Sequence, residues 1–167
     1  PVKRSDAQPL VVRHIKGNMA LAYNGALTNA TELRESLELG GAIFQTENDS
    51  EVIAYEITSA RLKTDAIESA LEQAMYRIKG AYSLVLMSPK KLLAARDPQG
   101  FRPLSIGKMG DSILVASETC AFESVGAEFI RDIEPGEIVV IDENGIQSIR
   151  THCGQNTAQC VFEFIYF

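Results

Sequence analysis

The sequence has 167 residues, of which 46% are hydrophobic and 23% charged, and its formal net charge is −6 at pH 7. This length suits a single domain, residues 1–167, with a sizeable core. No apolar run reaches the ~18 residues of a membrane span, and no basic cluster offers a surface for nucleic acid. The 3 cysteines, an odd number without a C-x-x-C pair, favour a reducing compartment. We therefore expect a cytoplasmic protein that binds neither a membrane nor nucleic acid.

The first elements in chain order are a strand and a helix. The apolar run 19–23 predicts the strand, and the Asn24-Gly25 pair behind it is typical of a hairpin turn. Asn29 and Glu32 have the spacing of a capping box. A helix is therefore expected from there to the glycines at 40–41.

Two more helices follow. One is expected to begin near Asn48 and Asp49, with apolar residues at helical spacing behind them. The other is indicated by an i, i+3, i+4, i+7 pattern over residues 66–78, with Thr64 or Asp65 as its cap.

The second half of the chain changes to short strand-like runs separated by Gly and Pro. The predicted strands are 82–87, 92–95, 104–107, 113–116, 128–133 and 137–141. Helices followed by antiparallel hairpins favour a layered α+β domain. The apolar run 161–167 also resembles a strand, and because it has no polar tail we expect the chain to be cut from a longer one.

Three local patterns allow either a structural or a chemical interpretation. Asn24-Gly25 can be a hairpin turn, or an amide and a backbone N–H that stabilise an oxyanion in acyl transfer. Asp49 can be an acidic helix start, or a carboxylate that binds the ammonium group of an amino acid. The run 96–103 fits a type I turn at Asp97, whereas Arg102 is either a brace for that loop or a contact at a site.

The sequence resembles the amidophosphoribosyltransferase family, which is part of the broader group of N-terminal-nucleophile glutaminases. The matching stretches occur in the family's order and spacing and cover nearly the whole chain. They are 7–9, 23–27, 44–51, 80–83, 96–107, 116–122 and 160–167.

This resemblance implies the four-layer α-β-β-α sandwich of N-terminal-nucleophile hydrolases, with N-terminal strands missing and a gap in their place. It also implies a glutaminase domain that releases ammonia from glutamine. A phosphoribosyltransferase domain of the same parent chain, absent from this sequence, would add the ammonia to phosphoribosyl pyrophosphate. The product is 5-phosphoribosylamine, in the first committed step of purine biosynthesis.

The resemblance also implies roles for three residues. Asn24 and Gly25 match the catalytic oxyanion positions, and Gly25 and Asp49 match positions that bind the substrate. The family's nucleophile is an N-terminal cysteine whose own α-amino group acts as the base. Position 1 is Pro1, so we expect the nucleophile upstream and expect this fragment alone to be inactive.

For cofactors and partners, the resemblance implies none in this fragment, and Mg²⁺ with phosphoribosyl pyrophosphate in the intact enzyme. Cys160 matches a ligand of the [4Fe-4S] cluster that some members hold, and it is otherwise a buried strand cysteine. The intact enzyme is expected to be a homo-oligomer. Two alternatives stay open: a glutamine amidotransferase of the glucosamine-6-phosphate synthase or asparagine synthetase type, and a non-catalytic glutamine-binding module.

Overall fold

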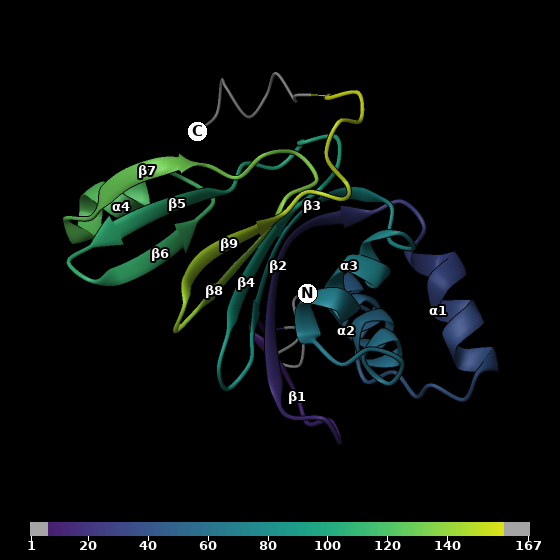
Figure 1. The fold of residues 1–167 in the computed structure, drawn as a ribbon. Helices are drawn as coiled ribbons and strands as arrows, with labels where there is room; N and C mark the ends of the chain where they lie inside the picture. The colour runs from purple at the N-terminus through teal and green to yellow at the C-terminus, as the bar shows by residue number, and fades with distance from the viewer. Residues whose placement is uncertain (1–6, 159–167) are drawn as a thin grey trace.

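The computed structural model describes residues 7–158, which fold into two antiparallel sheets with helices on their outer faces (Figure 1). The larger sheet has the strand order β1-β2-β3-β4-β8-β9 and the smaller sheet the order β6-β5-β7. The helices are α1 (Ala30–Leu39), α2 (Asp49–Arg61), α3 (Ile67–Met75) and α4 (Cys120–Val125). The strands are β1 (Leu10–Val12), β2 (Met19–Leu27), β3 (Gly80–Met87), β4 (Leu92–Arg96), β5 (Ser105–Met109), β6 (Ser112–Ala116), β7 (Glu128–Asp132), β8 (Ile138–Asp142) and β9 (Gly145–Ile149).

Helices α2 and α3 cover one face of the larger sheet. Alternate residues of the strands point to this face, so Leu21 of β2 and Leu84 of β3 are fully buried. They pack in one cluster with Ile53 of α2 and Leu71 of α3, also fully buried. Burying four such side chains contributes about 1.5–3 kcal/mol each. This cluster is the main core, and it fixes α2 against β2.

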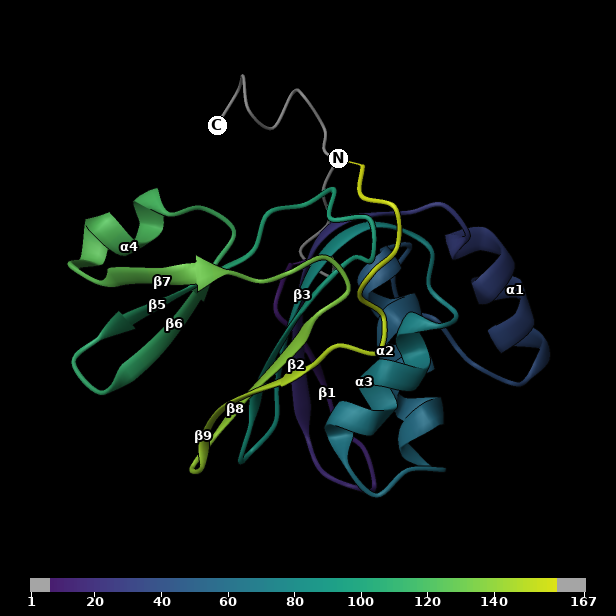
Figure 2. The ribbon, with the colours of Figure 1, turned by 45° about the horizontal axis from the view of Figure 1, so that its top comes forward.

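The smaller sheet packs on the opposite face of the larger one. Ala94 of β4 and Val139 of β8 lie in a second cluster with Ile106 of β5. The next residue of β5, Gly107, faces the other way, where an added Cβ would lie 2.7 Å from the ring of Phe122 in α4. Figure 2 shows α4 on the outer side of this sheet. The layers therefore run helix, sheet, sheet, helix, which confirms the predicted four-layer sandwich.

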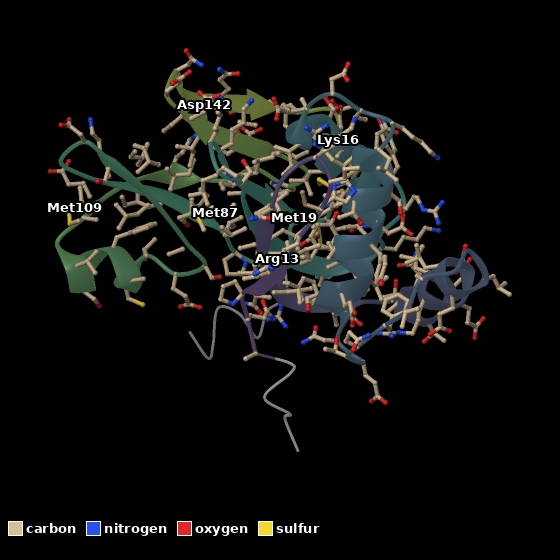
Figure 3. All side chains as sticks on the ribbon, turned by 90° about the horizontal axis from the view of Figure 1, so that it is seen from below. Arg13, Lys16, Met19, Met87, Met109 and Asp142 are labelled. Carbon is tan, nitrogen blue, oxygen red and sulfur yellow. The ribbon has the colours of Figure 1, made fainter. Side chains whose placement is uncertain are left out.

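Part of the inner face of the larger sheet is not covered by the described residues. In register across its strands, Val11 is opposite Ala20, and Ala20 is opposite Met87. Val11 is 66% exposed and Met87 56% exposed. Figure 3 shows Met87 clear of Met109, which lies on the smaller sheet. Among the described residues, the smaller sheet thus covers β4 and β8 but leaves β1 to β3 open at this level.

The hairpin interpretation of Asn24-Gly25 is wrong. Strand β2 continues through both residues and pairs with β3 from Ala20↔Met87 to Leu27↔Gly80. The capping box at Asn29 is also wrong, because the Asn29 side chain bonds the backbone at Arg77 and Lys79 and makes no cap bond to α1. Tertiary contacts override both local patterns.

The cap predicted for α3 is wrong as well. Its N-cap residue is Ala66, without a side-chain cap bond, because α3 begins at Ile67. The six predicted strands are present with ends shifted by one or two residues, and β1, α4 and β9 were not predicted. The predicted strand 161–167 lies outside the described residues. No helix within residues 7–158 is long and apolar enough to cross a membrane.

Candidate functional site

One edge of β2 is left open beyond the end of β1. Strand β1 pairs only with residues 19–21 of β2, whereas β3 follows the opposite edge of β2 as far as Leu27. Residues 23–27 therefore have one edge without a neighbouring strand in the described part of the chain (Figure 1). An open edge presents backbone groups that can bind something other than a strand.

Backbone N–H groups on this edge are directed at side chains. The N–H of Tyr23 donates to Oε1 of Gln8, and the N–H of Leu27 donates to Oδ2 of Asp49 at 2.9 Å. Because N–H groups alternate between the two edges of a strand, the N–H of Gly25 points to this same edge. The N–H of Gly25 therefore lies on this edge between two others, one bonded to the side chain of Gln8 and one bonded to the side chain of Asp49.

Gly25 is held close to β3. A Cβ added to Gly25 would lie 2.0 Å from the carbonyl oxygen of Ala81, closer than any real side chain approaches a backbone atom. The glycine is therefore required by the packing of the two strands. This requirement explains the residue type without the turn that the sequence suggested.

Asp49 stands at the first turn of α2 and binds β2 on both sides of Asn24-Gly25. Its Oδ2 accepts the bond from Leu27 and a second from the Tyr23 hydroxyl at 3.2 Å. No hydrogen bond to its Oδ1 occurs within residues 7–158. Helix capping does not need Asp49, because the Asn48 side chain accepts from the N–H of Ser50 at 3.0 Å. One oxygen of a half-buried carboxylate thus remains available at the open edge.

Glu51 folds the loop that leads into α2. Its carboxylate accepts hydrogen bonds from the N–H groups of Gln45 and Thr46 and from the Thr46 hydroxyl, at 2.7–3.1 Å. Glu51 is only 8% exposed. The loop is therefore closed onto the first turn of the helix, which also contains Asp49, and this fixes where α2 begins.

Asn24 extends to the other face of β2. Its side chain is exposed and lines a hollow of about 200 Å³ between the sheets, together with Gln8, Ser83 and Ser117. Tyr23 packs against the helix-side core instead. The structure thus brings Asn24, Gly25 and Asp49 to one edge, but with the Asn24 amide and the Asp49 carboxylate on opposite sides of the strand.

Tyr23 remains a proton donor in this setting. Burial raises the pKa of its hydroxyl, and the negative charge of Asp49 raises it further, against a smaller lowering by the cation of Arg102. A protonated Tyr23 can donate to Asp49 at any ordinary pH.

The loop after β4 is a structural turn. Asp97 is fully buried, and its side chain accepts bonds from the N–H groups of Gln99, Phe101 and Arg102 at 3.1–3.2 Å. The brace is Arg96, which donates to the carbonyl oxygens of Gly100, Arg102 and Ile133. The predicted turn has its 3.0 Å bond from the Gly100 N–H to the Asp97 carbonyl, and it is not type II because Gln99 has no positive φ.

The described cysteines lie elsewhere. Cys120 is exposed at the start of α4 and Cys153 is partly buried near the end of the described chain. Cys160, the predicted cluster ligand, lies outside the described residues. Within residues 7–158 no group of three or more His, Cys, Asp or Glu side chains is arranged to hold a metal.

Two residues of this edge had not been singled out from the sequence. Tyr23 was noted only as part of a resembling stretch, yet its place two residues before Gly25 puts both on one strand edge. Glu51 was interpreted as part of a helix start. Its spacing of five and six residues from Thr46 and Gln45 was the available signal for the closed loop.

The fold and this edge define a class of protein. A family model described as a glutamine amidotransferase domain matches residues 2–124, and the chain therefore belongs to that family. A glutamine amidotransferase class-II domain protein from Silicibacter pomeroyi, 18% identical, has a similar fold with a TM-score of 0.60. It covers 79% of this chain and 67% of its own.

Within the family, the chain is similar to amidophosphoribosyltransferases. It is 44% identical to that of Bacillus subtilis over 97% of this chain and 34% of the relative, and 41% identical to that of Methanocaldococcus jannaschii over 97% and 38%. The solved B. subtilis glutamine phosphoribosylpyrophosphate amidotransferase, complexed with ADP and GMP, superposes with a TM-score of 0.91. That match has 43% identity and covers 99% of this chain and 36% of the other. The chain spans about a third of the length of these relatives.

Proposed function

We propose that the chain is the glutaminase part of an amidophosphoribosyltransferase. In this proposal the open edge of β2 binds glutamine, whose side-chain amide is hydrolysed. The observation that carries the proposal is that Asp49 is bonded to the strand edge that carries the Gly25 N–H, while its Oδ1 accepts no hydrogen bond from residues 7–158. A carboxylate and a backbone donor on one strand edge can bind the two polar ends of one small amino acid.

Each end of glutamine then has a partner. The α-ammonium group binds Asp49, whose negative charge offsets the cost of removing that cation from water. The N–H of Gly25 and the amide of Asn24 stabilise the oxyanion that forms when the amide carbon is attacked, a contribution of about 3–4 kcal/mol for one such donor. The nucleophile, a cysteine with its own α-amino group as base, comes from outside the described residues.

The ammonia is transferred to phosphoribosyl pyrophosphate to give 5-phosphoribosylamine. The solved relatives support this step, since one is a phosphoribosylpyrophosphate amidotransferase and another is described as the allosteric regulatory enzyme of purine biosynthesis. In this proposal a phosphoribosyltransferase part binds the pyrophosphate with Mg²⁺, and the intact enzyme is a homo-oligomer. The role of Cys160 in an iron–sulfur cluster stays a prediction.

Calorimetric titration of the protein with L-glutamine tests the site. Asp49→Asn keeps the shape of the side chain but removes its charge, and is expected to weaken glutamine binding by at least tenfold, or about 1.4 kcal/mol. Asp65→Asn is the matched control, because Asp65 is exposed away from this edge. Equal affinities of the unchanged protein and Asp49→Asn would contradict the proposal.

Ammonia release by the 167-residue polypeptide is a separate measurement. We expect none above the uncatalysed rate, because residue 1 is Pro1 and not the cysteine that acts as nucleophile in the family. Turnover by this polypeptide would show that another group acts as nucleophile. Binding without turnover, also in a longer polypeptide, would favour a non-catalytic glutamine-binding module.

A further inference from the structure

Asp49 receives a side-chain hydrogen bond from only one residue in the described structure, and that residue is Tyr23, next to Asn24 in β2. We infer that Tyr23 is a positioning residue: its hydroxyl holds the Asp49 carboxylate so that Oδ1 is turned to the α-ammonium group of the substrate. This inference rests on the proposed function and adds to it a residue for which no role had been assigned.

The two donors to Oδ2 are different in kind. The Leu27 N–H is part of the backbone and holds the carboxylate at 2.9 Å, but a single bond leaves the group free to rotate about it. The Tyr23 hydroxyl donates to the same oxygen at 3.2 Å, and Tyr23 precedes Leu27 by four residues in β2. With both donors on Oδ2, the carboxylate has one orientation, and Oδ1 is the oxygen left to bind a ligand.

Tyr23 is itself held in place. Its N–H donates to Gln8, its ring packs against the helix-side core, and it is opposite Leu84 in the register of β2 with β3. A side chain fixed at its backbone and its ring can direct a hydroxyl without moving. Tyr23 therefore connects Asp49 to Asn24 and Gly25, because its hydroxyl bonds Asp49 and the next two residues of the strand are Asn24 and Gly25.

If Tyr23 positions Asp49, its hydroxyl matters for some ligands and not for others. Losing the hydroxyl should affect only ligands that carry an α-ammonium group, because Asp49 binds nothing else of the substrate. Glutarate monoamide has the carboxylate chain and side-chain amide of glutamine but lacks the α-amino group. It is therefore a probe that bypasses Asp49 while using the rest of the site.

Tyr23→Phe tests the inference, since it keeps the ring and removes the hydroxyl. We expect it to weaken L-glutamine binding about three- to tenfold by calorimetry, in line with the loss of one hydrogen bond of ordinary strength, and to leave the affinity for glutarate monoamide unchanged. Tyr76→Phe is the matched control and should change neither affinity, because Tyr76 is 58% exposed and packs on His152.

The outcomes separate this inference from the proposed function. If the unchanged protein binds glutamine and Tyr23→Phe binds it equally well, the positioning role is wrong and the proposed function stands. If Tyr23→Phe weakens both ligands equally, Tyr23 is merely structural and the inference is overturned. If the unchanged protein prefers glutarate monoamide to glutamine, Asp49 is no ammonium site and the proposed function fails together with the inference.

Discussion

At the scale of single residues, the site depends on a glycine whose role is steric. Gly25 lies in the middle of a strand, where glycine is ordinarily unfavourable. The carbonyl oxygen of Ala81 occupies the space that a side chain would need. The N–H of Gly25 is available because β1 ends before it, and residue 25 must be glycine because β2 and β3 approach so closely.

Gly25→Ala should destabilise the domain by about 3 kcal/mol or more, since a backbone atom at 2.0 Å cannot move aside without separating the strands. Gly110→Ala provides the comparison. Gly110 has a φ of 58° but nothing within 4 Å of its added Cβ, so only the conformational cost of about 1–2 kcal/mol is expected there. Urea unfolding of both variants measures the difference, and equal destabilisation would refute the steric account.

At the scale of elements, the start of α2 is set by the loop before it. The N–H groups of Gln45 and Thr46 donate to the carboxylate of Glu51, as they would donate to a backbone carbonyl in a strand or helix. A carboxylate that accepts several backbone bonds is a strong local tie. This tie determines the position of Asp49, two residues earlier in the same turn.

Glu51→Ala should free the amides of Gln45 and Thr46. Their hydrogen exchange is expected to become about ten- to a hundredfold faster, corresponding to about 1.5–3 kcal/mol for bonds to a charged group. Glu47→Ala is the control, because Glu47 is an exposed glutamate of the same loop. Exchange measured by NMR at the two amides decides the matter, and unchanged rates in Glu51→Ala would show that the loop is held by other contacts.

Sequence patterns predicted some of these elements correctly and failed for others. The start of α2 and the long apolar strands were predicted because their signals are local: an Asn cap and a run of buried residues. The hairpin interpretation of Asn24-Gly25 failed because its signal is equally local, whereas the pairing with β3 that keeps the pair extended joins residues about 60 positions apart. Strand β1 has only three residues, too few for a pattern to emerge.

The site itself could be predicted only in part. Asn24, Gly25 and Asp49 were found through their resemblance to a known family, since spacing alone favoured structural roles. Tyr23 and Glu51 act through hydrogen bonds that depend on how α2 meets β2, and no spacing rule contains that geometry. The roles of Asn24, Gly25 and Asp49 in catalysis and binding stay predictions.

At the scale of the whole molecule, the two sheets are joined by an ion pair between a half-buried arginine and a buried glutamate. Arg131 of β7 donates two bonds of 2.8 Å to the carboxylate of Glu137, which is fully buried. Ser148 of β9 and the N–H of Glu134 donate to the same carboxylate. This cluster connects the smaller sheet to the outer strands of the larger one, next to the second core.

The pair makes stability depend on pH in acid. Burial by itself raises the pKa of Glu137, but the bonds from Arg131, Ser148 and Glu134 outweigh it and hold the pKa below its ordinary value. A carboxyl group with a lowered pKa in the folded state contributes stability above its unfolded pKa of about 4.3. That contribution is lost as the pH falls through the lower folded value.

Glu137→Gln should therefore cost about 3 kcal/mol of unfolding free energy at pH 7, where it leaves Arg131 without its partner. The difference from the unchanged protein should shrink as the pH falls below about 4, because protonation removes the same charge from Glu137. Urea unfolding across this range measures it, with the exposed Glu143→Gln as control. A difference that stays constant to low pH would be inconsistent with an ionised Glu137.

In the proposed function, the open edge of β2 binds glutamine between Asp49 and Gly25. A crystal structure of the protein grown with L-glutamine tests it most directly. We expect the α-ammonium group within hydrogen-bond distance of Oδ1 of Asp49, and the side-chain carbonyl oxygen directed at the N–H of Gly25. Glutamine bound at another place on the molecule, or an edge that stays empty at saturating glutamine, would contradict it.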